Sequence, residues 1–258
     1  MLIPGLVSIS FRNLSVTEVI DQCRANQLPA IEWGGDVHVP HGDVEIATRA
    51  GEATRAAGLT VAAYGSYYRC DAETKQPEFG DVLASARALQ APVIRVWAGT
   101  TSSADTTAAK RDAIIFDLQR ISQLAAEQGI EISIEYHANT LTDDPDSALT
   151  LIEAVNHPNV KLYWQSSNGK SAEYSLAVLQ KLLPHVSHLH AFHWEFSGDD
   201  FDRRPLVEGQ ADWQKYLSIV ATSPRPDRAI MLEFVRDDST EQLANDAATL
   251  HAFLKNAG

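Results

Sequence analysis

The stretch IEISIEY (130–136) alternates apolar and polar residues, which is the pattern of a β-strand whose two faces have different surroundings. Ile132 and Ile134 fall on one face, whereas Ser133 and Glu135 fall on the other. An apolar face of this kind packs against helices in an α/β protein. The opposite face then directs Glu135 into the interior, at the C-terminal end of the strand.

Seven other short runs rich in apolar and β-branched residues have the length of β-strands. They are GLVSIS (5–10), AIEW (30–33), LTVAAY (59–64), VIRVW (93–97), VKLYWQ (160–165), VSHLHAF (186–192) and AIMLEF (229–234). Amphipathic segments separate them: one begins at a capping box of Ser15 and Glu18, and two end at Gly58 and Gly129. Strands that alternate with helices predict βαβ units, and this number of units predicts a single (β/α)8 TIM barrel, an α/β fold, over residues 1–258. A doubly wound sheet is the alternative, which the lack of a GxGxxG motif after the first strand disfavours.

The composition is that of a globular protein, with 45% hydrophobic and 21% charged residues. A net charge of −13 argues against nucleic acid or an anionic membrane as a partner, but not against a small-molecule substrate. No apolar run approaches the roughly 20 residues that span a bilayer, and the N-terminus lacks the pattern of a signal peptide. Cys23 and Cys70 match no disulfide or metal motif, so we expect a cytoplasmic protein with reduced thiols.

Four of the expected strands place one polar residue each at their C-terminal ends. These residues are Glu135, Gln165, His190 and Glu233. In a barrel they would meet at one rim, where the active sites of this fold lie. Two buried carboxylates are costly unless a cation lies between them, and two of them balance one divalent ion. An oxygen-rich ligand set with one imidazole predicts one Mn²⁺ ion, with Mg²⁺, Co²⁺ or Zn²⁺ as alternatives.

Other polar or aromatic residues near the same rim are candidates for contact with a substrate. We assign this role to Glu32, His38, His41, His137, Asn168, His193, Trp194 and Arg236. His188 shares the face of His190 and is expected to support the strand or to orient a ligand. Arg12 follows the first strand and could hold a substrate oxygen, whereas Arg95, in the middle of a strand, is expected to be a buried ion-pair partner.

The motifs resemble those of the xylose isomerase-like TIM barrels, the sugar phosphate isomerase/epimerase group. The resemblance runs through nearly the whole chain and rests on IEWGGDVHVPHGD (31–43), VIRVWAG (93–99), ISIEYH (132–137), LYWQ (162–165), HLHAFHW (188–194), EGQADW (208–213) and IMLEF (230–234). It implies the same four metal ligands, makes Glu135 and Glu233 the acid/base pair, and implies a homo-oligomer. The chain departs from the family pattern at Gln165 and Asn168, where the epimerases often have Asp and a His three residues later. It also lacks an Arg shortly after the HxH motif, and both departures leave the substrate open.

The residues and the resemblance together predict a metal-dependent isomerase or epimerase of a sugar, keto-sugar or polyol-derived carbonyl compound. A glutamate would remove a proton beside the carbonyl group, and the metal would stabilise the enediolate. The same residues could instead eliminate a β-substituent, so a lyase or dehydratase acting on a 3-keto-sugar is the alternative. An abasic-site endonuclease of this fold and a non-catalytic binding barrel are weaker hypotheses. The charge of −13 argues against the first, and the presence of both glutamates argues against the second.

Overall fold

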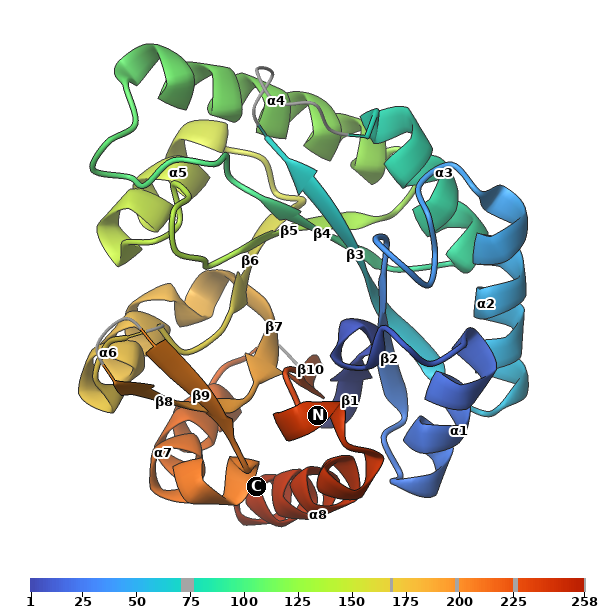
Figure 1. Ribbon diagram of the computed structural model, residues 1–258. Helices are drawn as coiled ribbons and strands as arrows, with labels where there is room; N and C mark the ends of the chain where they lie inside the picture. Colours follow the sequence, from blue (N-terminus) through green and yellow to red (C-terminus); the bar gives the residue numbers. More distant parts are fainter. Residues whose placement is uncertain (71–76, 168, 198–199, 225–226, 258) are drawn as a thin grey trace.

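The computed structural model describes residues 1–70, 77–167, 169–197, 200–224 and 227–257. A closed barrel of parallel strands is surrounded by helices (Figure 1). The strands, in the order that closes the barrel, are β1 (Leu2–Val7), β10 (Arg228–Leu232), β7 (Val186–Ala191), β6 (Val160–Trp164), β5 (Glu131–Glu135), β4 (Val93–Trp97), β3 (Thr60–Arg69) and β2 (Ala30–Gly34). The helices are α1 (Val16–Ala25), α2 (Val44–Ala56), α3 (Phe79–Leu89), α4 (Ala108–Ala126), α5 (Pro145–Val155), α6 (Ala172–Leu182), α7 (Gln210–Ala221) and α8 (Thr240–Ala257). The TIM barrel that the sequence predicts is therefore confirmed.

Local sequence determines where several helices begin and end. Ser15 and Glu18 form the predicted capping box at the start of α1, where the Glu18 carboxylate accepts a hydrogen bond from Ser15 N at 2.8 Å. The Asp43 side chain caps α2 by accepting from Ile46 N at 2.9 Å. Gly58 follows α2 with a φ of +78°, a conformation that glycine adopts without strain.

The core has two layers, one outside the strands and one inside the barrel. The larger layer packs the outward strand faces, including Ile132 and Ile134, against the helices. A smaller apolar cluster fills the lower barrel, with Ala30, Val93 and Met231 among its members. Above this cluster the barrel interior is polar, so the site described below rests on a packed base. No helix of the described residues is long and apolar enough to cross a membrane.

Two strands differ by several residues from the sequence prediction, and the other boundaries agree within two residues. β1 begins at Leu2, and the expected end of this strand is instead the short 3-10 helix η1 (Ser8–Phe11). β3 runs to Arg69, because a register shift between Gly65 and Tyr68 lets the strand continue past an irregularity.

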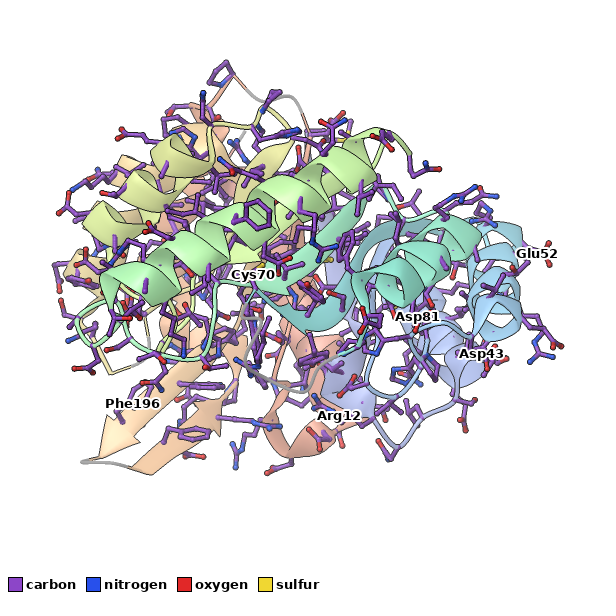
Figure 2. All side chains as sticks on the ribbon, turned by 90° about the horizontal axis from the view of Figure 1, so that it is seen from above. Arg12, Asp43, Glu52, Cys70, Asp81 and Phe196 are labelled. Atoms are coloured by element: carbon purple, nitrogen blue, oxygen red, sulfur yellow. The ribbon has the colours of Figure 1, made fainter. Side chains whose placement is uncertain are left out.

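An antiparallel hairpin of β8 (His193–Ser197) and β9 (Asp200–Arg204) follows β7, in a segment where the sequence analysis names no strand. The hairpin, which carries Phe196, extends from the barrel on the side where Arg12 also lies (Figure 2). The short 3-10 helices η2 (Leu183–His185), η3 (Leu206–Gly209) and η4 (Arg236–Asp238) complete the connections.

Candidate active site

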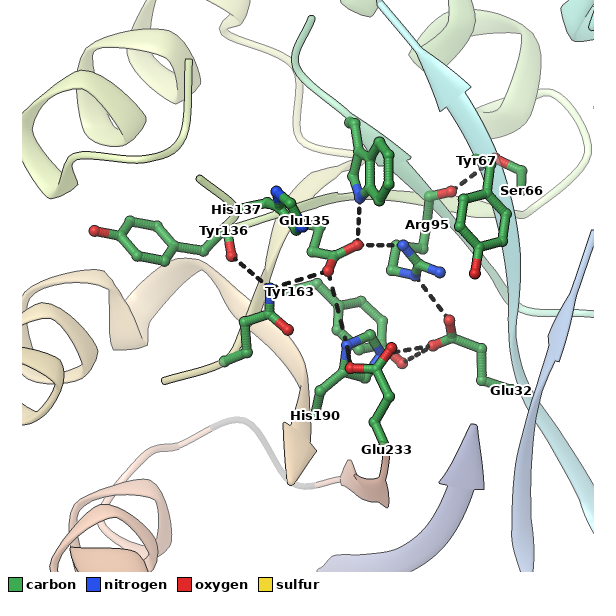
Figure 3. Close-up of polar contacts among 12 residues, drawn as sticks. Glu32, Ser66, Tyr67, Arg95, Glu135, Tyr136, His137, Tyr163, His190 and Glu233 are labelled. Atoms are coloured by element: carbon green, nitrogen blue, oxygen red, sulfur yellow. Dashed lines mark hydrogen bonds and ion pairs between the residues drawn. The ribbon is translucent and has the colours of Figure 1, made fainter. Parts of the chain in front are cut away.

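The four residues that the sequence placed at one rim lie together in the structure. Figure 3 shows three of them, Glu135, His190 and Glu233. Glu135 ends β5, Gln165 and Glu233 each follow a strand by one residue, and His190 lies in β7. All four are at most 5% exposed. Gln165 Nε2 donates to Glu135 Oε1 at 3.1 Å, and His190 Nδ1 lies 3.2 Å from Glu233 Oε2 and 4.0 Å from Glu135 Oε1. Strand parity therefore predicted this convergence correctly.

Three atoms of this group are buried without a hydrogen-bond partner among the described residues: Gln165 Oε1, His190 Nδ1 and Glu233 Oε2. Buried polar atoms are almost always hydrogen-bonded, so three potential ligand atoms without a hydrogen bond in one place fit a cation. In the described part of the chain, no three His, Cys, Asp or Glu side chains are arranged so that they could hold a metal ion by themselves. The donor set includes a glutamine amide, and Arg95 holds the Glu135 carboxylate from the other side.

A network of buried charges lies under these four residues. Arg95, from β4, donates through Nε to Glu32 Oε1 at 2.7 Å and pairs through Nη1 with Glu135 Oε2. Trp97 Nε1 donates to the same Glu135 oxygen. Burial alone would raise the pKa of Glu135, but Arg95 lowers it. The expectation that Arg95 is a buried ion-pair partner is confirmed.

The charges of this network balance a divalent cation. Burial alone would lower the pKa of His190, but Glu233 and Glu32 raise it to about 10. The imidazolium thus supplies positive charge where the carboxylates are close together. With His190 neutral, three carboxylates face one guanidinium and two negative charges remain, which is the charge of one divalent ion.

A cavity of about 190 Å³ opens above the polar residues, and we call it the rim cavity. It is lined by Ile9, Arg12, Tyr67, Arg95, Trp97, Glu135, His137, Gln165, Trp194, Glu233 and Phe234. His137 and Trp194 therefore lie where a substrate contact was predicted. Arg12 is held at the edge by Asp36 Oδ2 at 2.9 Å and by the Tyr67 hydroxyl at 3.1 Å. A polar cavity of about 530 Å³ adjoins the rim cavity at Gln165, which lines both.

Glu32, for which a substrate contact was predicted, does not line the rim cavity. Glu32 is fully buried and lies in the middle of β2, below the rim rather than at it. Its carboxylate accepts from Arg95, from Tyr163 at 2.6 Å and from His190 at 3.2 Å, so it belongs to the barrel interior.

His38 and His41 also lie away from the rim cavity. His38 is 5% exposed, bonds to Leu14 O at 3.0 Å and packs edge-on against Trp33. Trp33 points outward, since its indole nitrogen donates to Thr54 in α2. His41 bonds through Nε2 to the Ser66 carbonyl oxygen. The loop after β2 folds over the outside of the barrel wall, which corrects the placement of both histidines.

The remaining sequence candidates have different surroundings. His193 begins β8 and lines a separate cavity of about 190 Å³, which shares Trp194 with the rim cavity. Arg236 is exposed in η4, where it pairs with Asp237 at 3.4 Å, and does not line the rim cavity. Asn168 lies outside the described residues. His188 Nδ1 accepts from Ala229 N at 3.0 Å, as expected for a residue that supports the strand.

Sequence reasoning missed two aromatic residues of the rim cavity. Tyr67 and Phe234 have left-handed backbone φ values of 55° and 53°, which are unusual for bulky side chains. Strained backbone of this kind concentrates at functional sites. Neither residue has a sequence signal, because Tyr67 lies at the register irregularity in β3 and Phe234 just beyond the end of β10, and both features belong to the folded barrel.

The chain belongs to the xylose isomerase-like TIM barrel family, whose sequence model matches residues 20–257. It is 32% identical to a 3-dehydroshikimate dehydratase of Bacillus anthracis over 103 residues, which is 38% of this chain and 35% of that protein. The solved structure of the probable 3-DHS dehydratase AsbF of Bacillus anthracis, involved in petrobactin synthesis, has the same fold. Its TM-score is 0.80 at 21% identity, over 97% of this chain and 99% of that one. A D-psicose 3-epimerase of Clostridium cellulolyticum with D-tagatose is similar at a TM-score of 0.70 and 11% identity, over 98% and 99% of the two chains.

Proposed function

We propose that this protein is a divalent-metal-dependent lyase that removes water from a small cyclic β-hydroxy ketone. The observation that carries the proposal is that the two rim glutamates are not equivalent. Both oxygens of Glu135 accept hydrogen bonds, from Arg95 and Trp97 on one side and from Gln165 on the other. An epimerase that alternates two glutamates as base and acid needs both carboxylates free, whereas an elimination needs only one proton carrier.

Glu135, Gln165, His190 and Glu233 would hold the metal ion, for which Mn²⁺ is the first choice and Mg²⁺, Co²⁺ or Zn²⁺ are alternatives. Such an ion stabilises the negative charge that develops on a substrate carbonyl oxygen when the neighbouring C–H bond breaks. Three of these side chains each have a buried atom without a hydrogen bond, which supports this assignment.

His137 is the proton carrier in this proposal. It lines the rim cavity and packs against Trp97, with ring centroids 4.9 Å apart and the rings tilted by 34°. Its Nδ1 lies 2.7 Å from the Ala138 carbonyl oxygen. A carbonyl oxygen only accepts, so Nδ1 carries the proton and Nε2 is the basic nitrogen. Nε2 takes the proton from the carbon beside the carbonyl group, and the released electron pair forms the C=C bond as the β C–O bond breaks. The same proton returns to the leaving hydroxyl, which departs as water.

The walls of the rim cavity suit a compact ring. Trp97, Trp194 and Phe234 provide apolar faces, and Arg12 can hold an anionic or hydroxyl substituent at the edge. A cyclic keto-acid such as 3-dehydroshikimate has a carbonyl group, an acidic C–H bond and a β-hydroxyl group in one ring. The dehydratase relative makes it the first substrate to test.

The test is to incubate Mn²⁺-loaded protein with 3-dehydroshikimate and with 3-keto-glucose, and to follow the conjugated product by ultraviolet absorbance and proton NMR. We expect loss of water from one of them. His137→Gln should lower kcat by about 10²–10⁴-fold. His185→Gln is the matched control, because His185 lies in η2, which precedes β7 at the opposite end of the barrel. If neither compound loses water with loaded protein, the proposal fails.

Isomerisation or epimerisation is the second candidate, because Glu233 keeps one oxygen without a hydrogen bond and lines the rim cavity. Glu233 would then carry the proton of a ketose. Exchange of a substrate C–H proton with deuterated water, without loss of water, would favour this reaction over elimination.

A further inference from the structure

Glu32 makes no contact with the rim cavity, yet its two oxygens connect to two of the proposed metal ligands. Oε1 accepts from Arg95 Nε at 2.7 Å. Oε2 accepts from the Tyr163 hydroxyl at 2.6 Å and lies 3.2 Å from His190 Nε2 (Figure 3). The carboxylate is fully buried, so water does not compete for these bonds.

The contact with Glu32 determines which nitrogen of His190 is available as a ligand. A carboxylate accepts hydrogen bonds, so Nε2 of His190 carries a proton in this contact. Nδ1 then faces Glu233 Oε2 at 3.2 Å and Glu135 Oε1 at 4.0 Å. The Tyr163 ring packs on the imidazole with centroids 4.6 Å apart, which limits rotation of the His190 ring.

Glu32 also acts on Glu135, through Arg95. The Arg95 guanidinium donates to Glu32 through Nε and to Glu135 Oε2 through Nη1. The other oxygen of Glu135, Oε1, is then directed toward the other proposed ligands. The lack of a side chain at Gly65 leaves room for this arrangement. A Cβ atom there would lie 2.6 Å from Glu32 Oε1 and 2.8 Å from Arg95 Nη2.

We propose that Glu32 is a positioning residue that presents His190 Nδ1 and Glu135 Oε1 to the metal. The inference rests on the metal site of the proposed function, but not on the reaction. Partners behind a ligand commonly orient it, and their loss weakens metal binding by about 10- to 100-fold.

The first test uses the wild-type protein with Zn²⁺, which is diamagnetic. Long-range ¹H–¹⁵N NMR of protein labelled in its histidines reports which ring nitrogen carries the proton, and His190→Gln assigns the signal. We expect the proton on Nε2 and the metal on Nδ1. Zn²⁺ coordination through Nε2 would overturn the proposal, and this result does not depend on any variant of Glu32 folding.

The second test separates position from charge. Mn²⁺ affinity is measured by calorimetry on the wild type, Glu32→Gln and Glu32→Asp, with circular dichroism to verify folding. Asp keeps the negative charge but cannot reach both partners, so positioning predicts about 10-fold weaker binding by Glu32→Asp and up to about 100-fold by Glu32→Gln. If Glu32→Asp binds Mn²⁺ as tightly as the wild type, only charge matters and the proposal is overturned.

These outcomes are distinct from failure of the proposed reaction. A wild-type protein that binds one metal through Nδ1 but dehydrates no substrate would support the role of Glu32 and refute the lyase. A wild-type protein that binds no divalent metal would refute the metal site, and the positioning role with it.

Discussion

Replacing Arg95 with Met removes the guanidinium that pairs with both Glu32 and Glu135. Arg95 is 2% exposed, and Met fills much of the same space without charge. Removing one partner of a buried ion pair costs about 3–5 kcal/mol, because the remaining charge is uncompensated. In a chain of 258 residues this predicts a Tm that is lower by roughly 6–10 °C.

The pKa shifts of Glu32 and Glu135 predict how the stability loss in Arg95→Met changes with pH. In the wild type, burial would raise the pKa values of Glu32 and Glu135, but Arg95 lowers both. A lowered pKa contributes stability that is present above the ordinary value of 4.5 and is lost as the pH falls through the folded-state value. Without Arg95, burial dominates and raises these pKa values, so acidification from pH 7.5 to 5.5 should stabilise the variant. The Tm difference between the two proteins should therefore shrink at lower pH.

Differential scanning calorimetry at pH 7.5 and 5.5, in the presence of a chelator, measures both effects. Arg12→Met is the matched control, because Arg12 is 46% exposed and its ion pair with Asp36 is at the surface. Surface pairs contribute about 0–1 kcal/mol, so this control should shift Tm by no more than roughly 2 °C. A Tm for Arg95→Met within 2 °C of the wild type, or a difference that grows on acidification, would refute the reasoning.

Three further predictions test the metal site, a close contact and a helix cap. Mn²⁺ at about 100 times its Kd should stabilise the wild type by about 2.7 kcal/mol, which is a Tm increase of roughly 5 °C. A chelator should reverse this increase, and Glu233→Gln should not show it. Gly65→Ala should cost about 1–3 kcal/mol in urea unfolding, because its Cβ would overlap Glu32 and Arg95, whereas Gly80→Ala meets no atom within 4 Å and should be neutral or stabilising. Ser15→Ala removes the cap of α1 and should cost about 1 kcal/mol in the same assay; an unchanged midpoint would show that Glu18 alone suffices.

The rim could be predicted from the sequence because strand geometry is periodic. In a strand, side chains alternate, so Glu135 had to face opposite to Ile132 and Ile134 once the apolar face was assigned to the helices. The same rule applied to Gln165 and Glu233, and closure of the barrel then brought strands distant in sequence to one end. The convergence therefore followed from local patterns together with one choice of fold.

The depth of Glu32 in the barrel and the course of the loop after β2 could not be predicted in this way. Parity puts Glu32 inside the barrel, but its depth depends on the stagger between neighbouring strands, which is a property of the closed sheet. His38 and His41 lie in a loop, whose course over the barrel wall depends on contacts with Leu14 and Ser66. Sequence alone carries no periodic signal for such contacts, so it could not show that these histidines lie away from the rim cavity.

The charge inside the barrel explains how a neutral Gln165 is compatible with a site for one divalent ion. Three buried carboxylates face the Arg95 guanidinium, so two negative charges remain when His190 is neutral. A fourth carboxylate at position 165 would leave three negative charges, and the site would then retain a proton on one carboxylate or on His190. In the proposed site the Gln165 amide would instead add a ligand oxygen without adding charge. Arg95, which strand parity alone does not assign to the metal site, would thus set how many carboxylates the proposed site can hold.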